Sequence, residues 1–537
     1  MGGSAFDRLV ASCLDLKWHL DPVEATNAGI QDHDHRLGAF SADELKQSLA
    51  ALKSLSSAVE GATMDSIQDE VDQTALLNDL RVTISRFERE RQQERDPLFW
   101  ISHVLEGLYS LLVLRDRPKE HRSRAAAERL KAIPSFLDTA WETLVNPPAV
   151  LLNTAADVAM SGAALVDEVV IELPAGGEPE LDAVGQGAQE SLVAFSDRAR
   201  AEAGDKQKNE IGIGEEAFNF RLHYEHALNA NAAELWRYGM KLVEETEDEL
   251  VDVAAAIDGE TSWPDLVDRL RSDHPDVDEL VGAYASEMER SRHFVSEHDL
   301  VPIPDGTLEV VPTPQYLRPL IPFAAYQPPG AFSSDKTGWF YVTQPDRVAS
   351  SAETERRLRD HCVYEIACTA LHEGYPGHHV QFLSAQAQPR LVRKVIHTPL
   401  TVEGWALYCE EMMGEHGFYR GQEERLFRLL ALLWRAVRIL IDVGIHTRGM
   451  TFHHAVQLLI DKIHFDKESA EAEVRRYCAQ PAYQLCYAIG CRELISLRSD
   501  YRTAAGGSYS EAQFHSEVMS YGGLPVSLMR WGMNLNE

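Results

Sequence analysis

Three histidines and Glu373 lie within the eight residues that run from His372 to His379. Imidazole nitrogens and carboxylate oxygens are the ligands that zinc takes in hydrolases, where a glutamate beside the metal serves as general base. In the usual helical motif, two histidines four residues apart present both rings on one face. Here Pro376 stands four residues after His372, and the remaining histidines are His378 and His379. The segment therefore predicts a metal site built on a stretched form of that motif.

A continuous helix could not bring these rings to one ion. His378 would lie about 240° around the axis from His372, and His379 would lie roughly 10 Å further along it. Residues 374–377 are Gly-Tyr-Pro-Gly, and proline removes a backbone donor while glycine relaxes the dihedral limits. We therefore expect a kink or bulge there, with His378 preferred over His379 as the second ligand. The alternative is a helix that ends at Tyr375, followed by a turn and two surface histidines.

A second segment, residues 401–411, offers the remaining ligand. Zinc hydrolases of the glutamate type take their third protein ligand from a glutamate on a later helix, and Glu403 follows His378 by 25 residues. A glutamate near a helix start is also an ordinary dipole-stabilising residue, so the prediction rests on the two segments together. Glu410 and Glu411 are expected to support a ligand or to face solvent. One Zn²⁺ ion is expected, although Mn²⁺, Co²⁺ and Fe²⁺ suit the same ligands.

The two segments resemble the bacterial family known as domain of unknown function 885, whose members carry His-Glu-x-x-Pro-Gly-His-His-x-Gln followed by Val-Glu-Gly-Trp-Ala-Leu-Tyr. The resemblance runs nearly end to end, with further matching segments at residues 21–26, 325–329, 338–342, 442–446, 487–490 and 523–528. The family is similar to metallopeptidases of the gluzincin type. This resemblance implies a mainly α, two-lobed, zincin-like body with a small β-sheet beside the metal helix and a deep central cleft.

Several further side chains have candidate roles in such a site. Three protein ligands leave a position for water, which is the catalytic rather than the structural zinc pattern, and Glu373 would act as general base and then general acid. His446 and Tyr487 are candidate donors to the oxyanion, with packing in the core as the alternative for each. Arg438 and Arg448, on the same predicted helix as His446, are candidates for holding a substrate carboxylate, with an ordinary surface role as the alternative.

Helical periodicity dominates the chain outside one proline-rich region, and Asp21-Pro22 has the form of a helix N-cap followed by proline in the first turn. Loops are expected at residues 173–180 and 203–208. The predicted organisation is a helical N-terminal lobe, a β segment and a helical catalytic lobe, which together form one family domain; these parts cover residues 1–296, 297–350 and 351–537. The metal residues are expected at the end of a helix over 354–375.

The β segment is rich in proline, aromatic and β-branched residues, a composition that excludes a long helix and favours short strands. The run Gly338–Val342 is expected to border the cleft, and Tyr341 within it is a candidate contact for the substrate. A small sheet beside the metal helix could pair along its edge with an extended peptide. The alternative is a structured linker between the lobes.

Composition excludes several classes of partner. A formal charge of −33 over 537 residues argues against nucleic acid and against an anionic membrane surface, because both require clustered lysine and arginine. The first residues carry no basic and apolar export signal, and seven cysteines without paired short spacings are expected to be reduced thiols. A cytoplasmic location is therefore expected.

Taken together, the residues predict a zinc-dependent hydrolase, a metallopeptidase that cleaves short peptides with Glu373 as general base. One alternative is a non-catalytic scaffold that binds metal or peptide, and another is a zinc hydrolase of a non-peptide amide. The presence of Glu373 favours an enzyme, because a scaffold would not need the base. A di-iron bundle would need two Glu-x-x-His pairs, which the site helices lack, and the chain has no Gly-x-Ser-x-Gly elbow of a serine hydrolase.

Overall fold

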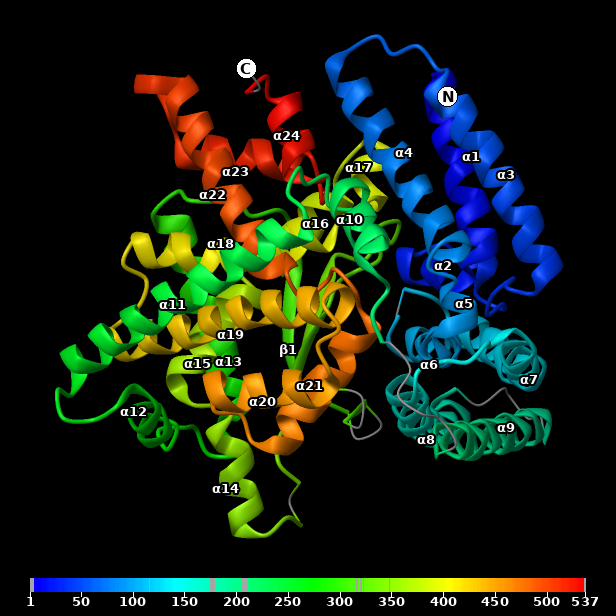
Figure 1. Cartoon of the computed structure of the whole chain (residues 1–537), viewed down its shortest axis with the longest axis horizontal. Coiled ribbons are helices and arrows are strands. Elements are labelled where there is room, and N and C mark those ends of the chain that lie inside the picture. Colours follow the sequence, from blue (N-terminus) through cyan, green and yellow to red (C-terminus); the bar gives the residue numbers. More distant parts are fainter. Residues whose placement is uncertain are drawn as a thin grey trace. The chain divides into compact units, whose positions relative to one another are not determined.

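The computed structural model describes residues 4–535, apart from 115, 174–178, 205–210, 315, 316, 319, 320, 322 and 347. The described residues form a mainly helical protein with one small three-stranded sheet (Figure 1), so the predicted fold class is confirmed. The loops predicted at 173–180 and 203–208 fall largely outside the described residues.

The chain divides into two compact units, Met1–Ile213 with Pro329–Asp335 and Gly214–Pro328 with Lys336–Glu537. This division differs from the boundaries predicted at residues 296 and 350. The helices that follow Gly214 pack with the later part of the chain, which places them in the second unit. Part of the proline-rich segment belongs to the first unit, because Phe332 donates its backbone N–H to the carbonyl of Ala28 and packs its ring against Trp18.

The first unit consists of helices only among its described residues. Its core gathers aromatic rings around Phe40, which contacts Phe87, Phe99 and Trp100 at centroid distances of 6.0, 4.8 and 6.0 Å. Asp21 caps the second helix, as the sequence predicted. The helices are α1 (Ala5–Leu20), α2 (Pro22–Ala28), α3 (Ala42–Glu60), α4 (Ile67–Glu88), α5 (Gln92–Arg95), α6 (Pro97–Val113), α7 (Lys119–Thr143), α8 (Ala149–Glu172) and α9 (Pro179–Gly204).

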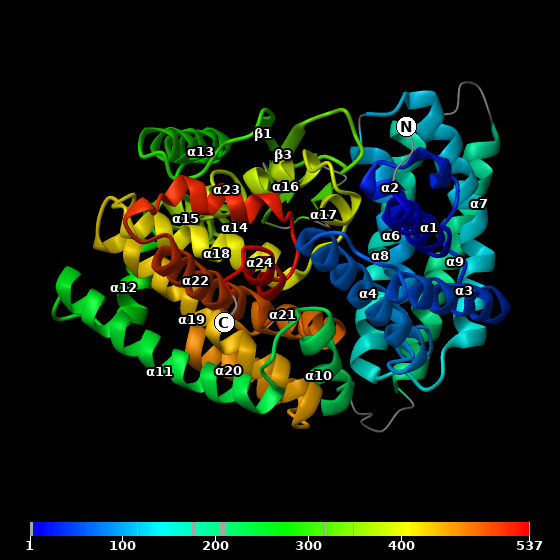
Figure 2. The same ribbon diagram turned by 90° about the horizontal axis from the view of Figure 1, so that it is seen from above.

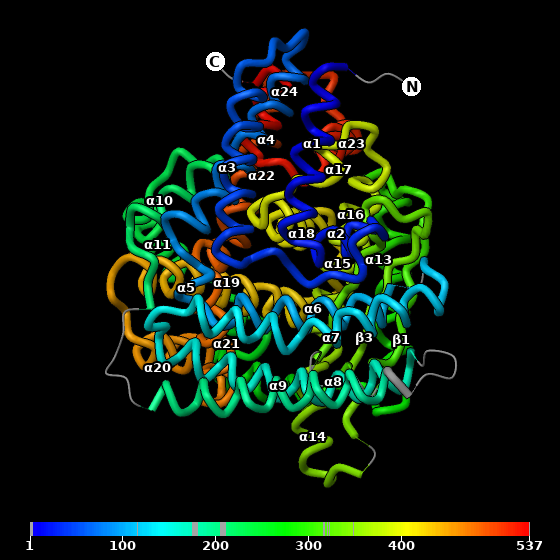
Figure 3. The backbone as a smooth tube through the Cα atoms, turned by 90° about the vertical axis from the view of Figure 1, so that its right-hand side faces the viewer, coloured from blue at the N-terminus to red at the C-terminus, as the bar shows by residue number. Residues whose placement is uncertain are grey.

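Helix α8 is long and apolar enough to cross a membrane by length and composition. Half of its most apolar window is buried inside the protein, and the helix packs against α6 and α9. Figure 3 shows α6, α7, α8 and α9 together in the lower part of the first unit. A core helix of a soluble protein passes the same test, and α8 has contacts of that kind within the first unit.

The second unit holds the remaining elements, and its long helix α19 contacts many of the others (Figure 2). The elements are α10 (Glu215–Tyr224), α11 (Ala232–Ile257), α12 (Trp263–Leu270), α13 (Leu280–Glu297), β1 (Thr307–Pro312), β2 (Ala324–Gln327), β3 (Thr337–Val342), α14 (Ser351–Arg359), α15 (Val363–Glu373), α16 (His378–Gln386), α17 (Leu391–Val395), α18 (Pro399–Glu415), α19 (Gln422–Thr447), α20 (Phe452–Ile463), α21 (Lys467–Ala479), α22 (Cys486–Ala505), α23 (Glu511–Ser520) and α24 (Val526–Gly532).

The sheet has the order β1-β3-β2, with β1 parallel and β2 antiparallel to the central strand β3. Phe340 and Val342 of β3 form a buried cluster with Tyr284 of α13 and with Ile366 and Ala370 of α15. Because Ile366 and Ala370 lie four residues apart, they occupy one face of α15. The sheet therefore holds this helix by one face and leaves another face for chemistry.

The single helix predicted over 354–375 is instead the two helices α14 and α15. The N–H of Val363 donates to the carbonyl of Asp273, at 2.9 Å, and so makes no bond to the preceding helix. His361 is buried beside the hydroxyl of Tyr284, with a ring nitrogen 3.0 Å from that oxygen. These tertiary contacts turn the chain between the helices, and they could not be read from local periodicity.

Candidate metal centre

The helix that carries His372 ends where the sequence predicted a break. Helix α15 stops at Glu373, and α16 begins at His378 after four intervening residues. The N–H of Gly377 donates to the carbonyl of Leu371, at 3.1 Å, and a side chain on Gly377 would collide with the backbone of His372. Only glycine permits this close return of the chain, and the return brings His378 back beside His372.

Two histidines and a glutamate converge at this break. His372, His378 and Glu403 each offer a ligand atom, and these atoms all lie within 4.8 Å of one another. Nε2 of His378 lies 3.5 Å from Oε2 of Glu403. Two ligand atoms of a tetrahedral zinc ion with bonds of about 2.1 Å would be about 3.4 Å apart. The spacing of this pair therefore suits a shared metal ion.

His379 lies apart from this cluster. Its side chain is fully buried, and its Nδ1 lies 3.0 Å from the hydroxyl of Tyr326. Burial lowers the pKa of His379 to about 4, and the ring fits because Gly338 of the sheet has no side chain to occupy its place. Both His378 and His379 are buried, so the alternative of two surface histidines does not describe this protein.

A second carboxylate on α18 holds the first histidine. Oε1 of Glu410 lies 2.7 Å from Nδ1 of His372 and 3.8 Å from a guanidinium nitrogen of Arg435. Burial would raise the pKa of Glu410, but the charge of Arg435 and the contact with His372 lower it. An ionised Glu410 accepts a hydrogen bond from Nδ1 of His372, which directs the other ring nitrogen toward the cluster.

Glu403 is held in turn by a tyrosine. The hydroxyl of Tyr483 donates to Oε1 of Glu403 at 2.5 Å. Burial would raise the pKa of Glu403, but its contacts with His378 and Tyr483 lower it to about 2. The helices α18 and α22 cross closely here, because Gly404 and Gly490 have no side chains to separate them. This crossing brings the residues around the start of α22 against Glu403.

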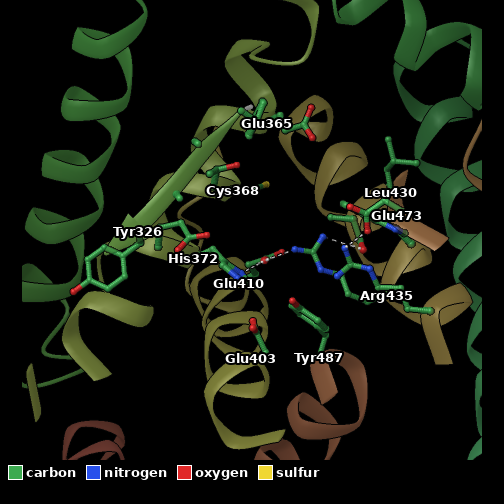
Figure 4. Close-up of a pocket in the computed structure, with 18 of the residues that line it drawn as sticks. Tyr326, Glu365, Cys368, His372, Glu403, Glu410, Leu430, Arg435, Glu473 and Tyr487 are labelled. Atoms are coloured by element: carbon green, nitrogen blue, oxygen red, sulfur yellow. Dashed lines mark hydrogen bonds and ion pairs between the residues drawn. The ribbon is translucent and has the colours of Figure 1, made fainter. Parts of the chain in front are cut away.

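The cluster opens into a pocket of about 890 Å³ within the second unit (Figure 4). Glu373, half-buried, lines it beside the ligand residues. Glu365, Thr369 and His372 also line it, and their spacing of four and three residues places them on one face of α15. The face of α15 that does not pack on the sheet is thus the face that meets the pocket.

Tyr487 and Arg438 also line the pocket, as the sequence predicted they could. Tyr487 is buried, and burial together with the charge of Glu403 raises the pKa of its hydroxyl to about 12, so it stays a donor at neutral pH. The guanidinium carbon of Arg438 lies 4.8 Å from the centre of the Tyr487 ring. Figure 4 shows Tyr487 beside Glu403 and below Arg435.

Three predicted site residues lie elsewhere. His446 is buried in the core with its Nε2 3.0 Å from the carbonyl oxygen of Tyr477, and it does not line the pocket. Arg448 is exposed and stacks on Trp236 at 4.6 Å. Tyr341 is buried on the central strand β3. The prediction that β3 borders the cleft is corrected, because the pocket is lined by the edge strand β2.

Other residues of the site were missed from the sequence. Tyr326 lies in the segment 325–329, to which no role was assigned, and Tyr483 lies four residues before Tyr487. Arg435 precedes Arg438 by three residues on α19, so both occupy one helix face. That spacing was a signal available in the sequence. The hydrogen bond from Tyr483 to Glu403 could not be predicted from spacing, because it depends on how α18 and α22 cross.

Comparison with protein families identifies the family of this chain. The family model described as "Bacterial protein of unknown function (DUF885)" matches residues 22–533, and the chain belongs to this family. No curated protein matches the sequence.

Two solved structures resemble the chain over nearly its whole length. One, from Shewanella oneidensis, is described as "a putative lipoprotein of unknown function"; it has a TM-score of 0.83 at 21% identity and covers 99% of this chain and 100% of its own. The other, "the putative lipoprotein from Colwellia psychrerythraea", has a TM-score of 0.82 at 18% identity and covers 98% of each chain. At these identities the likeness shows a shared fold.

The cytoplasmic location expected from the sequence is contradicted by these descriptions. Each of the two proteins that share the fold is described as a "putative lipoprotein", and that description points to a membrane-anchored or secreted location for them. The seven cysteines, all free and buried, do not distinguish between these locations, since a thiol without a partner forms no disulfide in any compartment.

Proposed function

We propose that this protein is a metal-dependent hydrolase of the gluzincin type, and that it acts as a metallopeptidase on short peptides. The observation that carries the proposal is the convergence of His372, His378 and Glu403 within 4.8 Å of one another at the wall of a pocket. Zn²⁺ is the ion that best matches two imidazoles and one carboxylate in this arrangement.

The chemistry of the donors supports a catalytic rather than a structural site. Three protein ligands are available among the described residues, whereas structural zinc is closed by four. His372 is fixed by the buried Glu410 and Glu403 by the part-buried Tyr483. Such partners orient a ligand before the metal binds. The side of the cluster that faces the pocket is left for water and substrate.

Each remaining residue has a definite task in the proposed reaction. A zinc ion bound there would lower the pKa of a water molecule to about 7. Glu373 accepts a proton from the attacking water and later donates it to the departing amine, so one carboxylate serves as base and then as acid. The hydroxyl of Tyr487 donates a hydrogen bond to the oxygen of the scissile carbonyl as negative charge develops on it.

The strand beside the pocket favours a peptide as substrate. Strand β2 lies at the edge of the sheet, and Ala324, Ala325 and Tyr326 line the pocket. An edge strand can hydrogen-bond to an extended peptide through its backbone. The same chemistry would also cleave a non-peptide amide, and the edge strand is the feature that favours the peptide.

A mixed library of short peptides, with cleavage followed by mass spectrometry, tests this proposal. Wild-type protein with bound zinc should cleave members of the library. Glu373→Gln should keep the metal and lose activity by about 10²- to 10⁴-fold, whereas the matched variant Glu411→Gln should keep both, since Glu411 pairs with Arg428 away from the cluster. Zinc-bearing protein that cleaves no peptide would instead support the non-catalytic scaffold.

A further inference from the structure

Three arginines gather beside Tyr487 on the pocket wall. Arg435 and Arg438 come from α19 and Arg476 from α21, and all three line the pocket; we call them the arginine cluster. The guanidinium carbons of Arg438 and Arg435 lie 4.8 and 5.8 Å from the centre of the Tyr487 ring. Arginine stacked on aromatic rings presents its N–H groups at the edge of the guanidinium plane, in the geometry that binds carboxylates.

The carboxylates around the arginine cluster do not balance it. Glu473 forms ion pairs with two members of the cluster. Its Oε2 lies 3.4 Å from a guanidinium nitrogen of Arg438 and 2.7 Å from one of Arg476. Among the described residues, the one ion pair of Arg435 is with Glu410, at 3.8 Å, and Glu410 is bonded more closely to His372, at 2.7 Å. In the part of the chain that the structure describes, the three guanidinium groups thus form ion pairs with two carboxylates, one of which is also the partner of a candidate metal ligand. The cluster has the capacity to bind one more anion.

Arg435 shows the deficit most directly. One terminal nitrogen donates to the carbonyl of Ala431 in its own helix, at 3.2 Å. Its Nε is buried and has no hydrogen-bond partner among the described residues. A buried donor on a charged group is expensive to leave unsatisfied. An anionic ligand held by the part of Arg435 that lines the pocket would offset the charge of this poorly compensated guanidinium group.

We propose that the arginine cluster binds a carboxylate of the substrate, an inference that rests on the proposed hydrolase function. Arg435 is separated from His372 only by Glu410, as Figure 4 shows. Tyr487 lies beside both Glu403 and the arginines. The bound carboxylate therefore lies close to the scissile bond. The substrates are short peptides that carry a free C-terminal carboxylate, or an acidic side chain, next to the bond that is cleaved.

Isothermal titration calorimetry on the Glu373→Gln protein tests the carboxylate site without hydrolysis. The probes are N-acetyl-trialanine as the free acid, the same peptide as its C-terminal amide, and the amide of N-acetyl-Ala-Glu-Ala. We expect the free acid to bind about 10- to 100-fold more tightly than its amide, because a charge-assisted hydrogen bond is lost in the amide. A glutamate peptide that binds as tightly as the free acid would identify an acidic side chain as the source of the carboxylate.

The arginine is tested by adding Arg435→Gln to the same protein, with Arg448→Gln as the matched control. Arg448 is the residue that directly follows α19, and it stacks on Trp236 outside the pocket. Arg435→Gln should remove the preference for a carboxylate, Arg435→Lys should retain part of it, and Arg448→Gln should leave it unchanged.

The result that overturns the carboxylate site is equal binding of all three probes by the parent protein, including no binding of any. This parent measurement does not depend on whether an arginine variant folds. The carboxylate site would also be overturned if the protein with Arg435→Gln still bound the free acid more tightly than the amide. A protein that prefers the free acid but never cleaves any peptide overturns only the hydrolase proposal, and one that cleaves acid and amide equally overturns only the carboxylate site.

Discussion

Glu410 places its Oε1 2.7 Å from Nδ1 of His372, while Glu403, seven residues earlier on the same helix α18, points into the metal cluster. Seven residues make nearly two turns, so both carboxylates lie on one face. One helix thus supplies a candidate ligand and also the carboxylate that orients another ligand. The geometry of the site depends on how α18 lies against α15.

Replacing Glu410 tests this relationship. Glu410→Gln should weaken zinc affinity by about 10- to 100-fold, the usual effect of losing a carboxylate that supports a histidine ligand. Competition with a chromogenic chelator measures the affinity. Glu411→Gln is the control, since its carboxylate pairs with Arg428 instead. Equal affinities for Glu410→Gln and wild type would show that the Glu410–His372 contact does not orient a ligand.

We expect the two tyrosines near Glu403, Tyr483 and Tyr487, to have different roles. Tyr487→Phe should lower kcat by about 10²- to 10³-fold, as the loss of an oxyanion donor does, and should leave zinc affinity unchanged. Tyr483→Phe removes the hydroxyl that donates to Glu403 and should weaken zinc affinity instead. Steady-state kinetics and chelator competition on both variants check this. If Tyr487→Phe keeps full kcat, its hydroxyl has no part in the reaction.

The close crossing of α18 and α22 should be sensitive to a single methyl group. A side chain on Gly490 would collide with the carbonyl of Leu400 and with Gly404, so Gly490→Ala should lower the free energy of unfolding by about 1–3 kcal/mol. Gly282→Ala is the control on an exposed face of α13, where no atom lies within 4 Å of the new methyl group. Gly282→Ala should raise the free energy of unfolding by up to about 1 kcal/mol, because alanine has a higher helix propensity than glycine. Urea unfolding measures both; similar effects would exclude the steric explanation.

Asp442 should make stability depend on pH. It is fully buried, and it accepts hydrogen bonds from the backbone N–H groups of Ala482 and Leu485 just before α22. Burial raises its pKa to about 7, although these bonds oppose the shift. As pH rises above about 4, the unfolded chain loses this proton first while the folded protein keeps it until about pH 7. This carboxyl therefore lowers the free energy of unfolding as pH rises through that range.

Urea unfolding of wild type and Asp442→Asn across that pH range isolates the contribution. Asparagine does not ionise, and its side-chain oxygen can still accept one of the two bonds. The free energy of unfolding of the variant, taken relative to wild type, should therefore increase as pH rises through that range, whatever other groups titrate. Two profiles of the same slope would mean that Asp442 does not retain its proton in the folded protein.

The sequence predicted those parts of the site that depend on local spacing. Residues 374–377 could not continue a helix, and the chain does break there. The helical character of most of the chain followed from periodicity, whereas the short strands followed from composition and the small sheet from the family resemblance. Glu403 was identified because it follows the histidines in a recognisable segment, and the structure brings it to within ligand distance of His372 and His378.

The parts that escaped prediction depend on tertiary packing. The sequence offered His446 and Tyr487 as equivalent candidates for the oxyanion donor. The packing of α19 and α22 places His446 in the core and Tyr487 in the pocket wall. Tyr341 was placed at the cleft because β3 was not known to be the central strand. Arg448 lies at the end of α19, where the helix has already left the pocket.

Metal content tests the central claim most directly. Inductively coupled plasma mass spectrometry should be applied to protein purified without a histidine tag or added metal, as wild type, His372→Ala, Glu403→Ala and His379→Ala. Near one equivalent of zinc in wild type and His379→Ala, with loss in the other two variants, is the predicted result. Wild-type protein that neither carries nor takes up stoichiometric metal would contradict the hydrolase proposal, and loss of metal in His379→Ala alone would contradict the assignment of the ligands.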